Sequence, residues 1–121
     1  YHEIRKRGIR VVIGGDYGFS VTPMGQNARD IEHFVKYFGY SPAEALRCAT
    51  VIGAELMGMG HELGRVKESF LADLLLVKGN PLKDVALVQR QENLAMIMQA
   101  GKLYKDPRGQ AQADRHLIAA E

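Results

Sequence analysis

Asp16 is the residue of this sequence whose type and position most clearly suggest chemistry. It follows the largely apolar run Ile9–Gly15, which ends in two glycines. Continuous Val and Ile runs are typical of parallel strands that are covered on both faces, and such folds place their chemistry in the loops at the carboxyl ends of the strands. The pattern predicts a buried strand that delivers a carboxylate to a site. A carboxylate at such a position can equally be a turn or helix-capping group, so both interpretations stay open here.

Three further candidates lie in the irregular stretch that follows, residues 17–26. Glycine and proline interrupt this stretch too often for a regular element, and loops of this length in compact domains tend to be functional. Tyr17, Phe19 and Met24 could line a substrate pocket. The alternative is that these apolar side chains only fix the loop against its surroundings.

The other residues with metal-binding or nucleophilic side chains form no recognisable motif. The four histidines, which are too scattered for a ligand pair, are His2, His33, His61 and His116. The pair His61-Glu62 is followed by Arg65 where a zinc-protease helix needs a second histidine. Cys48 has no activating base at motif spacing, so we interpret it as a core thiol.

Helices are predicted on either side of this loop. Residues 1–7 read as a closing helical turn that Gly8 terminates. Apolar residues at helical spacing predict a helix from Asn27, as its cap, to Phe38, with Gly39 as its stop. On this helix the charged residues Arg29, Asp30 and Glu32 are interpreted as a solvated face.

A second helix and a small all-β segment complete the predicted elements. Ser41-Pro42-Ala43-Glu44 has the pattern of a capping box with proline at the first helical position, and the helix should run to about Met57. The predicted strands are 63–66 paired with 73–77, and 93–99 paired with 102–104. The run 74–77 is continuously apolar, which predicts burial on both faces. The break near Gly60 gives the predicted division into residues 1–60, 61–105 and a tail, 106–121, which could be a loose helix from about Gln110.

Composition narrows the classes of partner. The chain has 121 residues, 46% hydrophobic and 25% charged, with a formal net charge of +2 spread along the sequence. Basic residues do not interleave with aromatic ones, which argues against nucleic acid as a partner. No apolar stretch approaches the ~20 residues of a membrane span. The single cysteine fits a reducing compartment, and a cytoplasmic location is expected.

A set of short motifs, weak singly but specific in their order and spacing, resembles the carboxyl-terminal part of the amidohydrolase superfamily. The motifs are Gly14-Gly15-Asp16, Gly25-Gln26-Asn27-Ala28-Arg29, Ser41-Pro42-Ala43-Glu44-Ala45-Leu46-Arg47, Ala49-Thr50, Leu63-Gly64-Arg65-Val66, Leu71-Ala72-Asp73-Leu74 and Gly79-Asn80-Pro81-Leu82. The most similar branch is that of the imidazolonepropionase-like and prolidase-type Xaa-Pro dipeptidase enzymes. The resemblance extends over nearly all of residues 9–105.

The resemblance implies a fold and a site. It makes the chain an α/β protein, the carboxyl-terminal piece of a metal-dependent hydrolase (β/α)8 TIM barrel plus part of the adjoining small β-sandwich domain. Residues 9–15 would be the eighth strand. Asp16 would ligate one of one or two divalent metal ions, usually zinc in this family, and would carry a proton from the attacking water to the leaving amine. The family's remaining ligands cannot be placed in this sequence.

The expected function is hydrolysis of a carbon-nitrogen bond in a small amide, dipeptide or cyclic amide by the parent protein. The chain alone should be inactive, because one carboxylate cannot hold a catalytic metal at useful affinity. A predicted parallel strand without a partner in the sequence also needs cover, from the missing amino-terminal part of the same protein or from a second copy. The alternative hypothesis is therefore a non-catalytic structural or interaction module that self-associates through the exposed strand.

Overall fold

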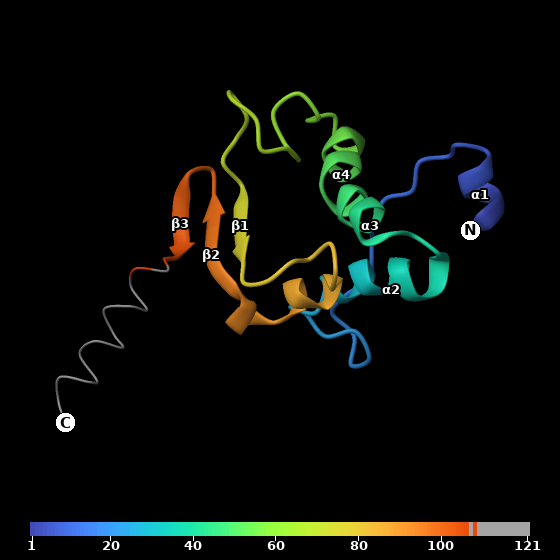
Figure 1. Ribbon diagram of the computed structural model, residues 1–121, viewed down its shortest axis with the longest axis horizontal. Helices are drawn as coiled ribbons and strands as arrows, with labels where there is room; N and C mark the ends of the chain where they lie inside the picture. Colours follow the sequence, from blue (N-terminus) through green and yellow to red (C-terminus); the bar gives the residue numbers. More distant parts are fainter. Residues whose placement is uncertain (107, 109–121) are drawn as a thin grey trace.

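The computed structural model describes residues 1–106 and 108, and arranges them as a helical part followed by a small sheet (Figure 1). The helices are α1 (His2–Lys6), α2 (Arg29–Phe38), α3 (Pro42–Ala49) and α4 (Val51–Leu56). The strands are β1 (Leu74–Val77), β2 (Leu94–Gln99) and β3 (Lys102–Lys105), with the short 3-10 helices η1 (Val85–Gln89) and η2 (Gln91–Asn93) between β1 and β2. The helix predicted from Gln110 lies outside the described residues.

The segment 9–15 does not form the predicted strand. None of its residues pairs with a strand, and the three strands of the described chain pair only with one another. A strand requires a hydrogen-bonded neighbour, and no described segment supplies one here. The segment is also only partly covered, because Ile9 is exposed while Val11 and Ile13 pack against the helical core. The prediction of a fully buried strand is therefore wrong for the described chain.

The predicted start of α2 was wrong, and its predicted end was confirmed. The helix begins at Arg29 with Ala28 as its N-cap, and no side chain caps it, so Asn27 does not have the expected role. It ends at Gly39, whose φ of 69° places it in the left-handed region that glycine adopts without steric cost. The predicted turn at the start of the chain is α1, and Gly8 follows it with φ 65°.

The capping box of α3 is formed as predicted. The Ser41 hydroxyl accepts a hydrogen bond from the Glu44 amide at 3.3 Å, and the Glu44 carboxylate accepts one from the Ser41 amide at 2.8 Å. The predicted continuous helix to Met57 is interrupted at Thr50, which separates α3 from α4. The Thr50 hydroxyl donates to the Leu46 carbonyl at 2.8 Å, a back-bond that often bends helices.

The core lies between α2 and α3. Its buried members are Phe34, Tyr40, Ala45 and Cys48. Ala45 is completely buried, and its small side chain lets the helices approach closely. Cys48 is a buried core thiol, as predicted, and burial raises its pKa.

The sheet is antiparallel with the order β1-β2-β3. Its strands and the β2-β3 hairpin were predicted, but β1 pairs with β2, and residues 63–66 form no strand. Leu75 and Leu76 are 55% and 52% exposed, so the prediction that β1 is buried on both faces is wrong. The 3-10 helix η1 packs against α2. The division of the chain near Gly60 stays a prediction.

Candidate functional site

The loop after Asp16 is held together by Thr22. The Thr22 amide donates to the Phe19 carbonyl at 3.0 Å, and the Thr22 carbonyl accepts from the Gly18 amide at 2.8 Å. The Thr22 hydroxyl then donates to the Asp16 carbonyl at 2.8 Å. The loop therefore contains a tight turn that is attached to the main chain of Asp16.

The carboxylate of Asp16 is exposed and accepts no hydrogen bond from residues 1–106 or 108. Its main chain is thus held by Thr22 while its side chain is left available. A capping or turn carboxylate accepts bonds from nearby amides, so Asp16 does not have that role among the described residues. Its predicted role as a metal ligand stays a prediction.

Tyr17 turns away from the loop and onto α2. It is half-buried, and its hydroxyl donates to Asp30 Oδ1 at 2.8 Å. Burial, and then the neighbouring Asp30 carboxylate, raise the pKa of the Tyr17 phenol above its usual value of 10.0. Phe19 and Met24 lie in the same loop and are 61% and 74% exposed. Their predicted role as substrate contacts, like that of Tyr17, stays a prediction.

Tyr17 and Asp30 approach Gly15 closely. A Cβ atom added at Gly15 would overlap both the Tyr17 ring and the Asp30 carboxylate, whereas one added at Gly14 would meet nothing within 4 Å. The two glycines that precede Asp16 therefore differ in the space available for a side chain. Only Gly15 has a packing reason to lack a side chain.

Sequence reasoning missed Asp30. The interpretation of Arg29, Asp30 and Glu32 as a solvated face is wrong, because all three are half-buried. Asp30 accepts the Tyr17 hydrogen bond and lies 3.6 Å from His33 Nδ1, and Glu32 accepts from Gln89 Nε2 at 2.9 Å. The spacing of Asp30 and His33, three residues apart on one helix face, was the available signal.

A cavity of about 280 Å³ lies beside the two glycines. Gly14, Gly15, Asp30 and His33 contribute to its lining together with aromatic side chains of α2. Among residues 1–106 and 108, no three His, Cys, Asp or Glu side chains are close enough to hold a metal ion. The described residues therefore do not form a metal site by themselves.

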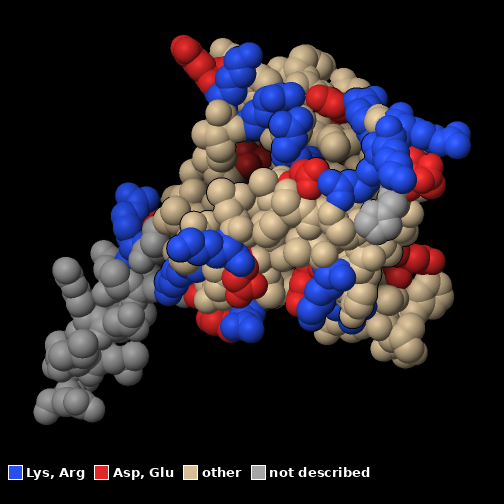
Figure 2. Space-filling model, turned by 45° about the vertical axis from the view of Figure 1, so that its right-hand side comes forward, with Lys and Arg blue, Asp and Glu red and all other residues tan. Residues whose placement is uncertain are grey.

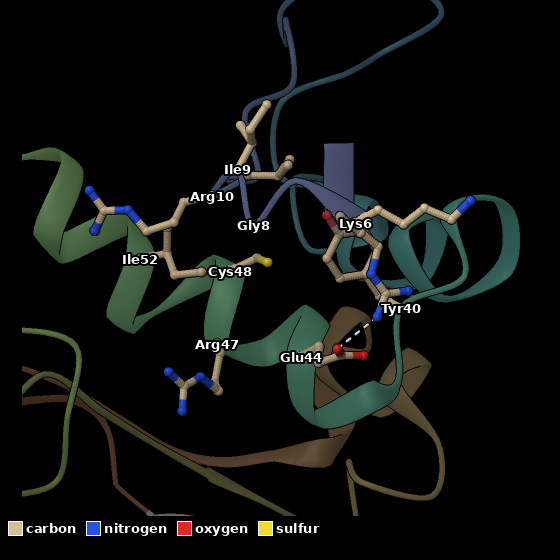
Figure 3. Close-up of a pocket in the computed structure, with 11 residues that line it drawn as sticks. Lys6, Gly8, Ile9, Arg10, Tyr40, Glu44, Arg47, Cys48 and Ile52 are labelled. Atoms are coloured by element: carbon tan, nitrogen blue, oxygen red, sulfur yellow. Dashed lines mark hydrogen bonds and ion pairs between the residues drawn. The ribbon is translucent and has the colours of Figure 1, made fainter. Parts of the chain in front are cut away.

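A second cavity, of about 490 Å³, lies at the opposite end of the segment 9–15, between its first residues and α3 (Figure 3). Cys48 points its sulfur towards the middle of this cavity, while the guanidinium groups of Arg10 and Arg47 point away. Its one carboxylate, Glu44, is held by the capping box and by Arg5 Nη2 at 2.7 Å. Burial raises the pKa of the Cys48 thiol, and the carboxylate is already bonded, so neither group is poised for catalysis here.

On the face shown in Figure 2, Lys and Arg side chains are interspersed with Asp and Glu. No helix in the described part of the chain has the length and apolar character needed to cross a membrane.

Comparison with known proteins decides the family. The sequence pattern of the amidohydrolase family matches residues 2–104. The chain belongs to this family. It is 29% identical to the ochratoxinase of Aspergillus niger over 108 residues, 88% of the chain and 22% of that protein. It is 35% identical to the imidazolonepropionase of Rubrobacter xylanophilus over 65 residues, 54% of the chain and 16% of that protein.

The fold agrees with this family. A solved structure of a Bifidobacterium longum protein, described as a prolidase, superimposes with a TM-score of 0.78 at 32% identity, covering 98% of the chain and 29% of that protein. The family resemblance and the α/β fold class are therefore confirmed: this amidohydrolase chain corresponds to a part of a (β/α)8-barrel protein. It spans less than a third of the length of the relatives that it matches.

Proposed function

We propose that this chain is the carboxyl-terminal part of a larger metal-dependent amidohydrolase that cleaves a carbon-nitrogen bond in a small amide, dipeptide or cyclic amide. Family membership and the relatives named ochratoxinase, imidazolonepropionase and prolidase support a hydrolase of this kind. Within the described chain, the observation that carries the proposal is Asp16, an exposed carboxylate without hydrogen bonds whose main chain is held by Thr22.

Asp16 would act as a metal ligand and a proton shuttle. A bound divalent cation, proposed to be zinc, lowers the pKa of water towards ~7 and polarises the carbonyl of the substrate. Asp16 would accept a proton from the attacking water and return it to the amine that leaves. The described residues contain no group of three metal-binding side chains, so ligands other than Asp16 would come from elsewhere in the larger protein. The 121-residue chain alone should therefore be inactive.

The test is hydrolysis by the larger protein, supplemented with zinc or manganese, of a panel containing proline dipeptides and N-acyl amino acids. We expect Asp16→Asn to lower kcat about 100-fold or more, the range for loss of a general acid-base group, and to lower the zinc content. Glu92→Gln is the matched control, because it neutralises an exposed carboxylate outside the site. A supplemented parent that hydrolyses nothing in the panel, with Asp16→Asn making no difference to its zinc content, would refute the proposal.

A second candidate is favoured by the apolar residues that the described chain leaves exposed. Examples are Ile9, Leu56, Met57 and Val66. Apolar surface of this kind marks an interface when it is contiguous. The second candidate is a non-catalytic module in which a second copy of the chain covers this surface. We propose instead that the rest of the same protein covers the segment 9–15. Light scattering during size-exclusion chromatography separates them, since a stable dimer of the chain alone supports the second candidate and a monomeric larger protein supports cover from within.

A further inference from the structure

We propose that Tyr17, Thr22 and Asp30 form a clamp that fixes the main chain on both sides of Asp16, and that Tyr17 is a positioning residue and not a substrate contact. This inference rests on the function proposed above, since it concerns the same carboxylate. The clamp consists of two hydrogen bonds and one close packing contact. Each joins a residue next to Asp16, or Asp16 itself, to a more distant part of the chain.

The first hydrogen bond anchors the residue after Asp16. Tyr17 donates to Asp30 Oδ1 at 2.8 Å across a separation of 13 residues, and the pair is partly buried. Because the acceptor is a carboxylate on α2, the bond attaches the start of the loop to a helix of ten residues whose buried Phe34 belongs to the core. Hydrogen bonds to ionised acceptors are shorter and stronger than neutral ones.

The second hydrogen bond holds Asp16 itself, through Thr22 Oγ1 and the Asp16 carbonyl at 2.8 Å. The packing contact fixes the residue before Asp16, because the Tyr17 ring and the Asp30 carboxylate occupy the space where a Cβ of Gly15 would lie. Residues 15, 16 and 17 are thus held in turn, yet none of these contacts uses the Asp16 carboxylate. Such an arrangement limits the movement of a side chain that must meet a ligand or a proton with small positional error.

This geometry also explains why Tyr17 should not bind substrate. Its hydroxyl is already bonded to Asp30, and its ring is packed over Gly15. A substrate contact that used the hydroxyl proton would compete with the bond to Asp30. A clamp predicts that the hydroxyl matters for turnover and zinc affinity, whereas a substrate contact predicts that it matters for KM.

The experiment uses the larger protein with the panel above and measures kcat per bound zinc, KM, and zinc affinity by competition with a chelating dye. The variants are Tyr17→Phe, which removes one hydroxyl and keeps the ring, and Thr22→Val, which removes the other donor. Asp30→Asn and Asp30→Ala form a conservative pair, since only asparagine retains an oxygen that accepts from Tyr17. The matched control is Tyr37→Phe, because Tyr37 is an exposed tyrosine on α2, the helix that carries Asp30.

We expect Tyr17→Phe and Thr22→Val each to lower kcat about tenfold and to weaken zinc binding several-fold, with KM within about twofold of the parent. Asp30→Asn should retain more activity than Asp30→Ala, and Tyr37→Phe should match the parent. The inference is overturned if Tyr17→Phe raises KM alone, or if both hydroxyl variants keep parental kcat and zinc affinity while only the melting temperature falls. If Asp16→Asn is itself without effect on turnover and zinc content, the proposed function fails instead.

Discussion

Replacing Gly15 with alanine should disrupt the contact between the Asp16 segment and α2, while the same change at Gly14 should not. The added methyl group at Gly15 would overlap the Tyr17 ring and the Asp30 carboxylate, and at Gly14 it would enter open space. These two positions are adjacent, neither has a positive φ, and they receive the same new atom. The comparison therefore isolates the packing contact.

The size of the effect follows from the two ways in which the overlap could be relieved. Overpacking that the surroundings absorb costs about 1–3 kcal/mol. Rotation of Tyr17 out of the way would break its bond to Asp30, and the loss of a hydrogen bond to a charged group costs about 1.5–3 kcal/mol. The cheaper route sets the result, so we expect Gly15→Ala to lower the free energy of unfolding by about 2 kcal/mol. Gly14→Ala should change it by less than about 0.5 kcal/mol, or raise it slightly.

The assay is urea unfolding of the chain followed by circular dichroism, with amide hydrogen exchange of residues 14–17 as a local readout. Exchange should become faster in Gly15→Ala and stay unchanged in Gly14→Ala. In a Tyr17→Ala background, part of the cost of Gly15→Ala should disappear, because the ring that it meets is gone. The reasoning is refuted if the two glycine variants have equal stability and equal exchange rates.

Two further predictions concern the start of α3. Ser41→Ala should lower the free energy of unfolding by about 1 kcal/mol, because it removes the hydroxyl of the capping box. Urea unfolding measures this change, and an unchanged unfolding midpoint would contradict the contribution of the cap. Hydrogen bonds from the Ser41 amide and hydroxyl, and then Arg5, hold the pKa of Glu44 below its usual value of 4.5. A carboxyl group whose pKa is lowered by folding stabilises the fold at pH values above its usual pKa, and this stabilisation is lost as the pH falls through the folded-state pKa. The parent should therefore lose more stability below about pH 4.5 than Glu44→Gln does. Glu68→Gln is the control at an exposed carboxylate. If the parent and Glu44→Gln lose the same free energy of unfolding at acid pH, the lowered pKa of Glu44 does not contribute to stability.

Features set by neighbouring residues were predictable from the sequence. The capping box depends on a serine and a glutamate three residues apart, and the end of α2 depends on one glycine, so both were found. The hairpin of β2 and β3 is equally local. The break at Thr50 was missed although it is local, because a threonine that bonds back to the preceding turn has the same apolar pattern around it as one that does not.

Features that depend on distant partners could not be predicted in the same way. The run 9–15 has the composition of a buried strand, but whether it forms one depends on neighbours that the described chain does not supply. Asp16 could be singled out by its position after that run. The contact between Tyr17 and Asp30 could not, since nothing in the sequence shows that the loop folds back onto α2.

The docking of η1 on α2 has a practical consequence for dividing the protein. The hydrogen bond from Gln89 to Glu32 joins residues 57 positions apart, on opposite sides of the predicted boundary near Gly60. Truncation at that boundary would separate the bonded pair and uncover the side of α2 against which η1 packs. The same helix carries Asp30, which holds the loop beside Asp16. A shortened protein would therefore lose support behind its candidate site even though every residue of the clamp remained.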